Sequence, residues 1–258
     1  MDGKTPHLEN GISGLLAGLG RLSIMIWRTF LAVRFMFVSL GNIVRQMYFM
    51  GVRSIWLVAI TSVFTGGVSA WQAAYQFKDY VPVRYLGGAV GKAVLMELGP
   101  VLTALVLAGR IGAGIAAELG TMRVTEQVDA MESMAVDPIR YLVMPRVVAG
   151  IIMLPVLTLV SDFIAMLGAF LVSVQLVGME QETFMNGFKQ FFHLSDLLAG
   201  LIKSCGFGLI IAMMGCYFGF SASGGAEGVG SSTTKAVVAG AVLILVADFV
   251  LATFLFQL

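Results

Sequence analysis

Long apolar stretches, each about as long as a bilayer is thick, are the feature that most constrains this chain. A helix needs roughly 20 apolar residues to cross the hydrocarbon core, and runs of about that length recur between residues 55 and 256. The chain is 58% hydrophobic and 12% charged, whereas a soluble domain carries about 25% charged residues. The sequence therefore predicts an all-α integral membrane protein, and a net charge of +1 argues against a nucleic-acid partner.

Five transmembrane helices are predicted, over residues 55–75, 89–117, 147–177, 204–220 and 236–256. We expect Gly99-Pro100 to bend the second of them. Residues 178–203 mix polar and apolar side chains and predict one or two short helices at the far surface. The small-residue stretch 221–235 predicts a loop before the last helix.

The N-terminal segment 12–46 is apolar but is interrupted by arginines. Arg21 and Arg28 are seven residues apart and share one helix face, opposite Leu15, Leu19 and Leu22, which favours an amphipathic helix in the headgroup region. The alternative is a poor transmembrane helix, since central arginines are costly there. We therefore expect an N-terminal interfacial or elbow region over 1–50 and a transmembrane domain over 51–258. The polar start of the chain has no apolar core typical of a cleavable signal peptide.

Lysine and arginine set the expected orientation, because they concentrate in cytoplasmic segments. With a cytoplasmic N-terminus, the inside segments hold Lys4, Arg21, Arg28, Arg34, Arg45, Arg53, Arg123, Arg140, Arg146 and Lys235, and the outside segments hold Lys78, Arg84, Lys92, Lys189 and Lys203. The inside segments thus carry more basic residues than the outside segments. This places residues 118–146 in the cytoplasm.

That charged segment reads ELGTMRVTEQVDAMESMAVDPIRYLVMPR and lies between two apolar helices. Val124, Val128, Met131 and Ala135 recur at helical spacing, and Glu126, Asp129 and Glu132 form another face. Asp137-Pro138 should end the helix. We predict a short two-faced helix over about 118–137 that lies on the membrane surface or in a groove of another protein. The alternative is a solvated connector.

Polar residues inside apolar helices mark functional positions by default, because burying them in lipid is costly. Glu97, Arg110, Asp162 and Asp248 are such residues. Glu97 could line a cavity or form an internal ion pair, whereas a structural role is favoured for Asp162 and Asp248. Small residues form two ladders on the second helix, Ala104, Ala108, Gly112, Ala116 and Gly109, Ala113, Ala117, which suit packing within the chain or a symmetric dimer.

Several chemical signatures are missing from the sequence. Residues 87–92 resemble a phosphate-binding loop but lack its first glycine and its final serine or threonine. Neither HExxH nor GxSxG occurs, and two histidines do not make a metal cluster. We expect no catalytic residue, no metal site and no cofactor bound by this chain. If the chain drives uphill transport, the energy must come from an ion gradient or from another subunit, which would then bind the ATP and magnesium.

The run from Met96 to Gly150 carries a resemblance to a known family. The motifs ELGP, AGR-G, AE-G-M--TEQ, AVDP and PR--AG occur there in order. In these motifs the chain resembles the MlaE-type permeases of bacterial ABC transporters, which move phospholipids between the inner and outer membranes. Its length, its N-terminal amphipathic helix and its last apolar helix extend the resemblance to nearly the whole chain.

The resemblance implies a set of partners and a location. The family implies a homodimer in the bacterial inner membrane, with multiple spans and a cytoplasmic N-terminus. It also implies a cytoplasmic ABC ATPase docked on the short helix predicted over about 118–137, which would be the coupling helix. A hexameric periplasmic MCE-domain protein would lie over the dimer, and a STAS-domain protein would bind the ATPase. The implied activity is phospholipid transport that maintains outer-membrane lipid asymmetry.

The resemblance also implies site residues. The lipid pocket would be lined by the first two membrane helices at Ser69, Gln72, Gln76, Tyr80, Glu97 and Leu98. The coupling residues would be Glu118, Arg123, Glu126, Gln127, Val128, Met131, Met134 and Asp137. The sequence leaves open the lipid headgroup, the direction of transport and the face of the coupling helix that the ATPase contacts. Competing hypotheses are a proton-coupled secondary transporter of an amphiphilic solute, an intramembrane lipid enzyme and a passive scaffold.

Overall fold

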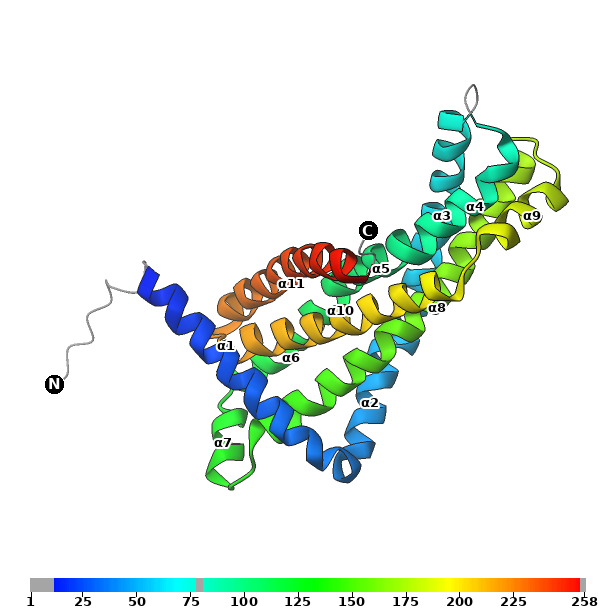
Figure 1. Cartoon of the computed structure of the whole chain (residues 1–258). Coiled ribbons are helices and arrows are strands. Elements are labelled where there is room, and N and C mark those ends of the chain that lie inside the picture. Colours follow the sequence, from blue (N-terminus) through cyan, green and yellow to red (C-terminus); the bar gives the residue numbers. More distant parts are fainter. Residues whose placement is uncertain (1–11, 78–80, 256–258) are drawn as a thin grey trace.

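Helices make up all the regular secondary structure in residues 12–77 and 81–255, the part of the chain that the computed structural model describes (Figure 1). Five stretches are long and apolar enough to cross a membrane, namely Leu16–Phe77, Val83–Val124, Ile139–Gln175, Leu194–Phe220 and Gly225–Leu255. The prediction of an all-α membrane fold with five spans is confirmed.

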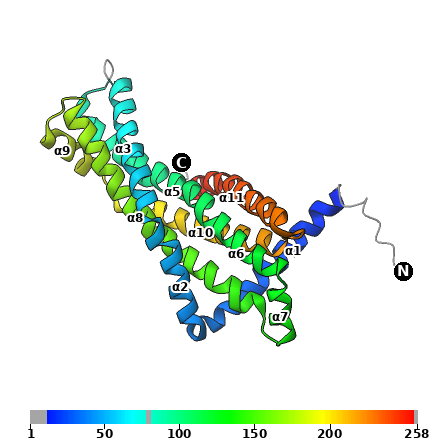
Figure 2. The ribbon, with the colours of Figure 1, turned by 180° about the vertical axis from the view of Figure 1, so that it is seen from behind.

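The N-terminal helix lies across the bundle instead of along it. Helix α1 (Ile12–Ala32) is followed by the 3-10 helix η1 (Val33–Ser39), α2 (Leu40–Met50) and a short 3-10 turn, η2 (Val52–Ser54). In both views α1 crosses the end of the bundle that carries α7 (Gln127–Ser133) (Figures 1 and 2). Its exposed residues include Trp27 and Phe30 beside the exposed Arg21 and Arg28, the pattern expected of an interfacial helix.

The first span, α3 (Ile55–Phe77), packs against the third, α8 (Met144–Gln175). Glycine permits the close approach of their backbones. A Cβ on Gly66 would overlap the backbone of Ala165, and one on Gly168 would overlap the backbone of Val63. Next to this contact, Ser62 and Ser161 share a buried hydrogen bond of 2.8 Å between their hydroxyl oxygens. Small residues thus set the position of the first span.

The second span is longer than predicted and is interrupted twice. After the 3-10 turn η3 (Val83–Tyr85) it consists of α4 (Leu86–Ala93), the π-helical turn η4 (Val94–Leu98), α5 (Gly99–Leu107), the π-helical turn η5 (Ala108–Gly112) and α6 (Ala113–Val124). The perturbation predicted at Gly99-Pro100 begins one turn earlier, as η4. Such π-turns inside α-helices are often found at functional sites.

The charged segment is not the single helix predicted over about 118–137. Glu118 and Arg123 belong to α6, which ends at Val124. Glu126 then has a left-handed backbone with φ 60°, and Ala135 repeats this conformation with φ 59° after α7. A left-handed residue cannot continue a right-handed helix, so two of them isolate α7 as a short separate helix. The chain re-enters the bundle through the π-helical turn η6 (Ile139–Val143).

The last part of the chain corrects two further boundaries. Helix α9 (Gln181–Phe191) is the predicted short surface helix, but α10 (Leu194–Phe220) begins at Leu194 and not near residue 204. Helix α11 (Gly225–Leu255) takes up most of the predicted loop 221–235. The side chain of Val229 would touch a Cβ on Gly120 at 3.4 Å, so α11 packs closely against α6. This packing overrides the weak helix propensity of the glycines and serines there.

The core explains one of the two small-residue ladders. Ala104, Ala108, Gly112 and Ala116 are buried against α10 and α11, where Gly215 and Gly219 would meet Ile115 and Leu119 if they carried a Cβ. The second ladder stays at the surface: Gly109 is exposed with no atom within 4 Å of its Cβ position, and Ala113 and Ala117 are half-buried. One ladder therefore packs within the chain and the other is free.

Candidate functional site

A buried lysine organises the polar residues of the second, fourth and fifth spans. The Lys203 side chain, on α10, is 0% exposed, and its Nζ donates to Glu97 Oε1 on η4 at 2.6 Å. It also lies 3.0 Å from Asp248 Oδ1 on α11. Two carboxylates thus share one ammonium inside apolar helices, where each unpaired charge would be costly. We call these three residues the Lys203 network.

Pro100 contributes to the network because it has no backbone N–H. In an α-helix the N–H of residue 100 would bond to the carbonyl of residue 96, but proline has no N–H. The freed carbonyl of Met96 instead lies 3.4 Å from Lys203 Nζ, which donates to it. Glu97 and Pro100 of the ELGP motif therefore serve the same ammonium, one by a charge and the other by releasing a backbone acceptor.

The network is closed on one side and open on the other. Lys203 is buried, the Asp248 side chain is 20% exposed and the Glu97 side chain is 43% exposed. A carboxylate that is held by a buried cation and still reaches the surface can accept hydrogen bonds from a ligand without losing its structural partner. Glu97 is thus both an internal ion-pair partner and a surface group.

Lys203 is the site residue that sequence reasoning missed. It was assigned to an outside segment because α10 was expected to begin after it, and the structure places it inside α10. The available signal was charge balance: acidic residues within two apolar helices call for a cation in a third. Arg110, the basic residue within the same span, forms no ion pair with Glu97 in the described part of the chain. Its guanidinium donates to the Ser54 hydroxyl and lies 5.8 Å from the centroid of the Phe49 ring.

The other predicted lipid-site residues divide into two groups. Ser69, Gln72 and Gln76 lie on α3, where Ser69 is half-buried and the two glutamines are exposed. Leu98 packs against a buried cluster that includes Ala70 of α3. Within residues 12–77 and 81–255, no hydrogen bond or ion pair joins Glu97 to the α3 residues. Tyr80 lies outside the described residues.

Several predicted coupling residues hold α7 and the turns beside it to the rest of the chain. Arg146, 4% exposed, bonds Glu118 at 3.0 Å. Arg123 pairs with Asp129, and Gln127 donates to the Thr125 hydroxyl at 3.1 Å. Asp137 accepts from Arg28 at 3.3 Å and from the Ile139 N–H at 3.0 Å. These contacts fix α7 relative to α6 and α1.

The faces of α7 are now distinguishable. Val128 is 3% exposed and Met131 packs against the core, so the predicted apolar face contacts the chain itself. Val128 therefore lies on the inner side of α7, and its role as a coupling residue stays a prediction. Glu126, Gln127, Glu132 and Met134 are exposed, and Met134 is exposed by 69%. A partner can reach only this outer side.

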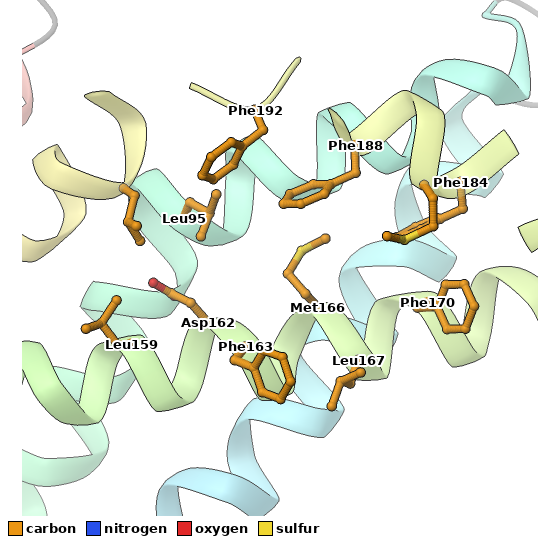
Figure 3. A pocket seen from close by; sticks show the side chains of 12 residues that line it. Leu95, Leu159, Asp162, Phe163, Met166, Leu167, Phe170, Phe184, Phe188 and Phe192 are labelled. Atoms are coloured by element: carbon orange, nitrogen blue, oxygen red, sulfur yellow. The ribbon is translucent and has the colours of Figure 1, made fainter. Parts of the chain in front are cut away.

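A separate apolar cavity of about 440 Å³ lies between α8, α9 and α10. Leu159, Phe163, Met166, Phe188 and Phe192 are among its lining residues, and the Asp162 carboxyl lies at one end of it (Figure 3). Asp162 is 3% exposed, and neither of its carboxyl oxygens has a hydrogen-bond partner among the described residues. It packs against Gly99, where a Cβ would overlap it. Asp162 does not belong to the Lys203 network.

Comparison with known proteins places this architecture. The family model described as Permease MlaE matches residues 43–254. A probable ABC transporter permease protein of Synechocystis sp. is 44% identical over 220 residues, covering 85% of this chain and 84% of the relative. A probable ABC transporter permease protein of Rickettsia typhi is 41% identical over 218 residues, covering 84% of each chain.

A plant relative extends the comparison. Protein TRIGALACTOSYLDIACYLGLYCEROL 1, chloroplastic, of Arabidopsis thaliana is 40% identical over 216 residues, covering 84% of this chain and 62% of the relative. The family model covers more than half of the chain, and the bacterial relatives align along most of their length. The chain therefore belongs to the MlaE family of ABC transporter permeases, membrane subunits whose transport implies a partner ATPase.

Proposed function

We propose that this permease moves phospholipids between the inner and outer membranes of a bacterium and so maintains outer-membrane lipid asymmetry. The Lys203 network carries the proposal, because it places a partly exposed carboxylate beside apolar helices at a break in the second span. A phospholipid has both parts that such a surface can contact, a polar headgroup and apolar chains. The name of the Arabidopsis relative refers to a glycolipid, which supports a lipid substrate.

The proposed substrate site combines Glu97 with one side of α3. Ser69, Gln72 and Gln76 follow each other at helical spacing, and Val68, Trp71 and Tyr75 are exposed beside them. In this proposal Glu97 contacts the polar headgroup, and the apolar side chains of α3 and Leu98 contact the acyl chains. Tyr80 would extend the polar side of the site.

The second span provides the mechanical link in the proposal. Residues 97–124 form a nearly continuous helix from Glu97 to the end of α6, about 40 Å at 1.5 Å per residue. A push on α7 would reach α6 through the Arg123–Asp129 pair and the buried Val128. The π-turn η5 lies between α6 and Glu97, and Glu97 itself belongs to the π-turn η4. Such turns inside α-helices are often found at functional sites. ATP-driven closure of the ATPase would thus change the geometry of the Lys203 network.

The remaining partners belong to the same proposal. The ATPase would contact the outer side of α7, with Met134 and Ala130 exposed one helical turn apart. A second copy of the chain would pack on the free ladder of Gly109 and Ala113. A hexameric MCE-domain protein on the periplasmic side would continue the lipid path, and a STAS-domain protein would bind the ATPase. The N-terminus would be cytoplasmic and the membrane the bacterial inner membrane.

Native mass spectrometry of the complex purified through this chain tests the proposal. We expect two copies of the chain, two ATPase subunits and bound phospholipid. A Glu97→Lys variant should keep the subunits together and lose the lipid. A complex without phospholipid, or one in which Glu97→Lys retains the wild-type amount of lipid, would contradict the proposed substrate site. A chain that purifies alone and moves a solute with a proton gradient would support the secondary-transporter alternative.

A further inference from the structure

A small pocket lies where the end of α1 and η1 meet the turn that follows α7. It has a volume of about 190 Å³ and is lined by Arg28, Leu31, Ala32, Arg34, Phe35, Asp137 and Arg140. Three arginines and one aspartate surround it. The pocket is far from the Lys203 network along the chain and contains none of its residues.

Two of the three arginines have no anionic partner in the described part of the chain. Arg28 bonds Asp137 at 3.3 Å. Arg34 and Arg140 form no hydrogen bond or ion pair within residues 12–77 and 81–255; their guanidinium carbons lie 4.7 Å and 3.8 Å from the centroid of the Phe35 ring. Stacking on an aromatic ring fixes a guanidinium while its N–H edge stays free to donate. The pocket therefore presents oriented donors and uncompensated positive charge.

An oxyanion with several acceptor oxygens fits this arrangement best. Guanidinium groups bind phosphate through paired, charge-assisted hydrogen bonds. Asp137 is already bonded to Arg28, which leaves Arg34 and Arg140 as the pair of guanidinium groups without an ion-pair partner in the described chain. The chemistry of the pocket thus favours a phosphate group over a cation or an apolar ligand.

The surroundings indicate that this phosphate belongs to a lipid. Phe30 is 71% exposed, Phe37 76% and Val38 78%. The arginines thus lie among apolar side chains whose exposure to water would be unfavourable. Arginine clusters beside exposed apolar residues are typical of sites at the headgroup level of a membrane. We propose that this pocket binds the phosphate of a membrane phospholipid, whose acyl chains run beside Phe37 and Val38.

The position of the pocket would bring the bound lipid into contact with the turn between α7 and η6. Asp137 follows α7 and bonds both Arg28 and the N–H of Ile139 at the start of η6. A phosphate in the pocket would bridge η1, which directly follows α1, and η6 through Arg34 and Arg140. The site would thus hold the N-terminal helix against the turn, which is a role distinct from that of a transported lipid.

Lipid titration of the delipidated complex, read by native mass spectrometry, tests the site. The probes are phosphatidylglycerol, diacylglycerol with the same chains and inorganic phosphate. The test variant is Arg34→Gln/Arg140→Gln. The matched control is Arg21→Gln/Arg45→Gln, which removes the same charge from exposed arginines of the same region that do not line the pocket.

We expect the test variant to weaken phosphatidylglycerol binding about tenfold or more, as the loss of charge-assisted hydrogen bonds implies, and the control to weaken it less than about twofold. Phe35→Leu keeps all charges and should weaken binding about threefold by releasing the stacked guanidinium groups. A shared thermal unfolding temperature for these variants would show that the fold is intact, and the Phe35→Leu comparison remains decisive if the double variant does not fold.

Three outcomes would overturn the proposal. Equal losses in the test and control variants would mean diffuse charge attraction. Equal binding of diacylglycerol would mean that the phosphate is not recognised. Displacement of phosphatidylglycerol by millimolar inorganic phosphate would mean a simple anion site instead of a lipid site. None of these readouts depends on transport, so the site can fail or hold independently of the proposed function.

Discussion

At the scale of single residues, the ELGP motif has a physical explanation in this chain. Glu97 supplies a carboxylate and Pro100 frees the Met96 carbonyl, and both acceptors meet the Lys203 ammonium. The sequence pointed to Glu97 because a carboxylate in an apolar helix is costly. It did not identify Lys203, since the two residues are 106 positions apart and only the packing of α10 on η4 brings them together.

Replacing Lys203 by methionine tests the network. The change keeps an unbranched apolar side chain one atom shorter than lysine and leaves the Glu97 and Asp248 carboxylates without their cation. We therefore expect a loss of about 1–3 kcal/mol in the free energy of unfolding, less than for a fully buried pair. The combined Glu97→Gln/Lys203→Met/Asp248→Asn variant should recover much of this loss, because no unpaired charge remains. Thermal unfolding in detergent measures both. An unchanged unfolding temperature for Lys203→Met would show that the network contributes nothing to stability.

Replacing Asp162 should raise the stability of the folded protein, whereas replacing Lys203 should lower it. Its carboxyl is buried without a partner in the described chain and borders an apolar cavity. Leucine has a similar branched shape and needs no hydrogen bond, so Asp162→Leu should stabilise the folded protein by about 1–3 kcal/mol. The measurement is the unfolding temperature of the purified permease. A lower unfolding temperature for Asp162→Leu would reveal a partner for the carboxyl, such as a bound ligand.

At the scale of elements, the charged segment 118–146 shows which structural features helical periodicity predicts and which it does not. The apolar spacing of Val128 and Met131 correctly indicated an amphipathic helix. It did not reveal that the apolar face packs on the chain itself, and it did not reveal the left-handed residues Glu126 and Ala135 that isolate α7. Backbone conformations of this kind depend on tertiary contacts and leave little trace in a single sequence.

Two substitutions on α7 separate docking from folding. Met134→Asp changes an exposed residue and should reduce association with the ATPase about tenfold, with no change in the unfolding temperature of the permease. Val128→Asp buries a charge in the core and should destabilise the permease itself by about 3 kcal/mol or more. Co-purification and thermal unfolding distinguish them. Undiminished ATPase binding by Met134→Asp would remove the outer side of α7 from the interface.

Helix boundaries were harder to predict than helix existence. The five spans were visible as apolar runs, but α10 and α11 each begin about three turns earlier than composition suggested. Gly225 to Lys235 is rich in small residues and was expected to be a loop. Packing against α6 supplies the stabilisation that the local sequence lacks.

At the scale of the whole molecule, the free ladder on the second span is the surface best suited to a second copy. Gly109 is exposed with open space around its Cβ position, and Leu102 is 37% exposed on the same face. Smooth faces of this kind let helices approach closely in lipid. The sequence alone could not tell this ladder from the buried one, because both have the same spacing.

A bulky side chain on the free ladder tests the dimer. Gly109→Leu should fit the isolated chain without strain and shift the permease from dimer to monomer by blocking close helix contact. Native mass spectrometry or mass photometry in detergent gives the stoichiometry. The control is Gly20→Leu on α1, which also has open space at its Cβ position. A Gly109→Leu permease that remains dimeric would place the interface elsewhere.

ATP-driven lipid transfer by the reconstituted complex is the most direct test of the central claim. The complex purified through this chain would be placed in vesicles that contain a fluorescent phospholipid, and lipid movement to acceptor vesicles would be measured with and without ATP. We expect ATP-dependent transfer by the wild type. We also expect transfer at least about tenfold slower for Lys203→Met, with ATP hydrolysis retained. Absence of ATP-dependent transfer by the wild type, or an undiminished rate for Lys203→Met, would contradict the account.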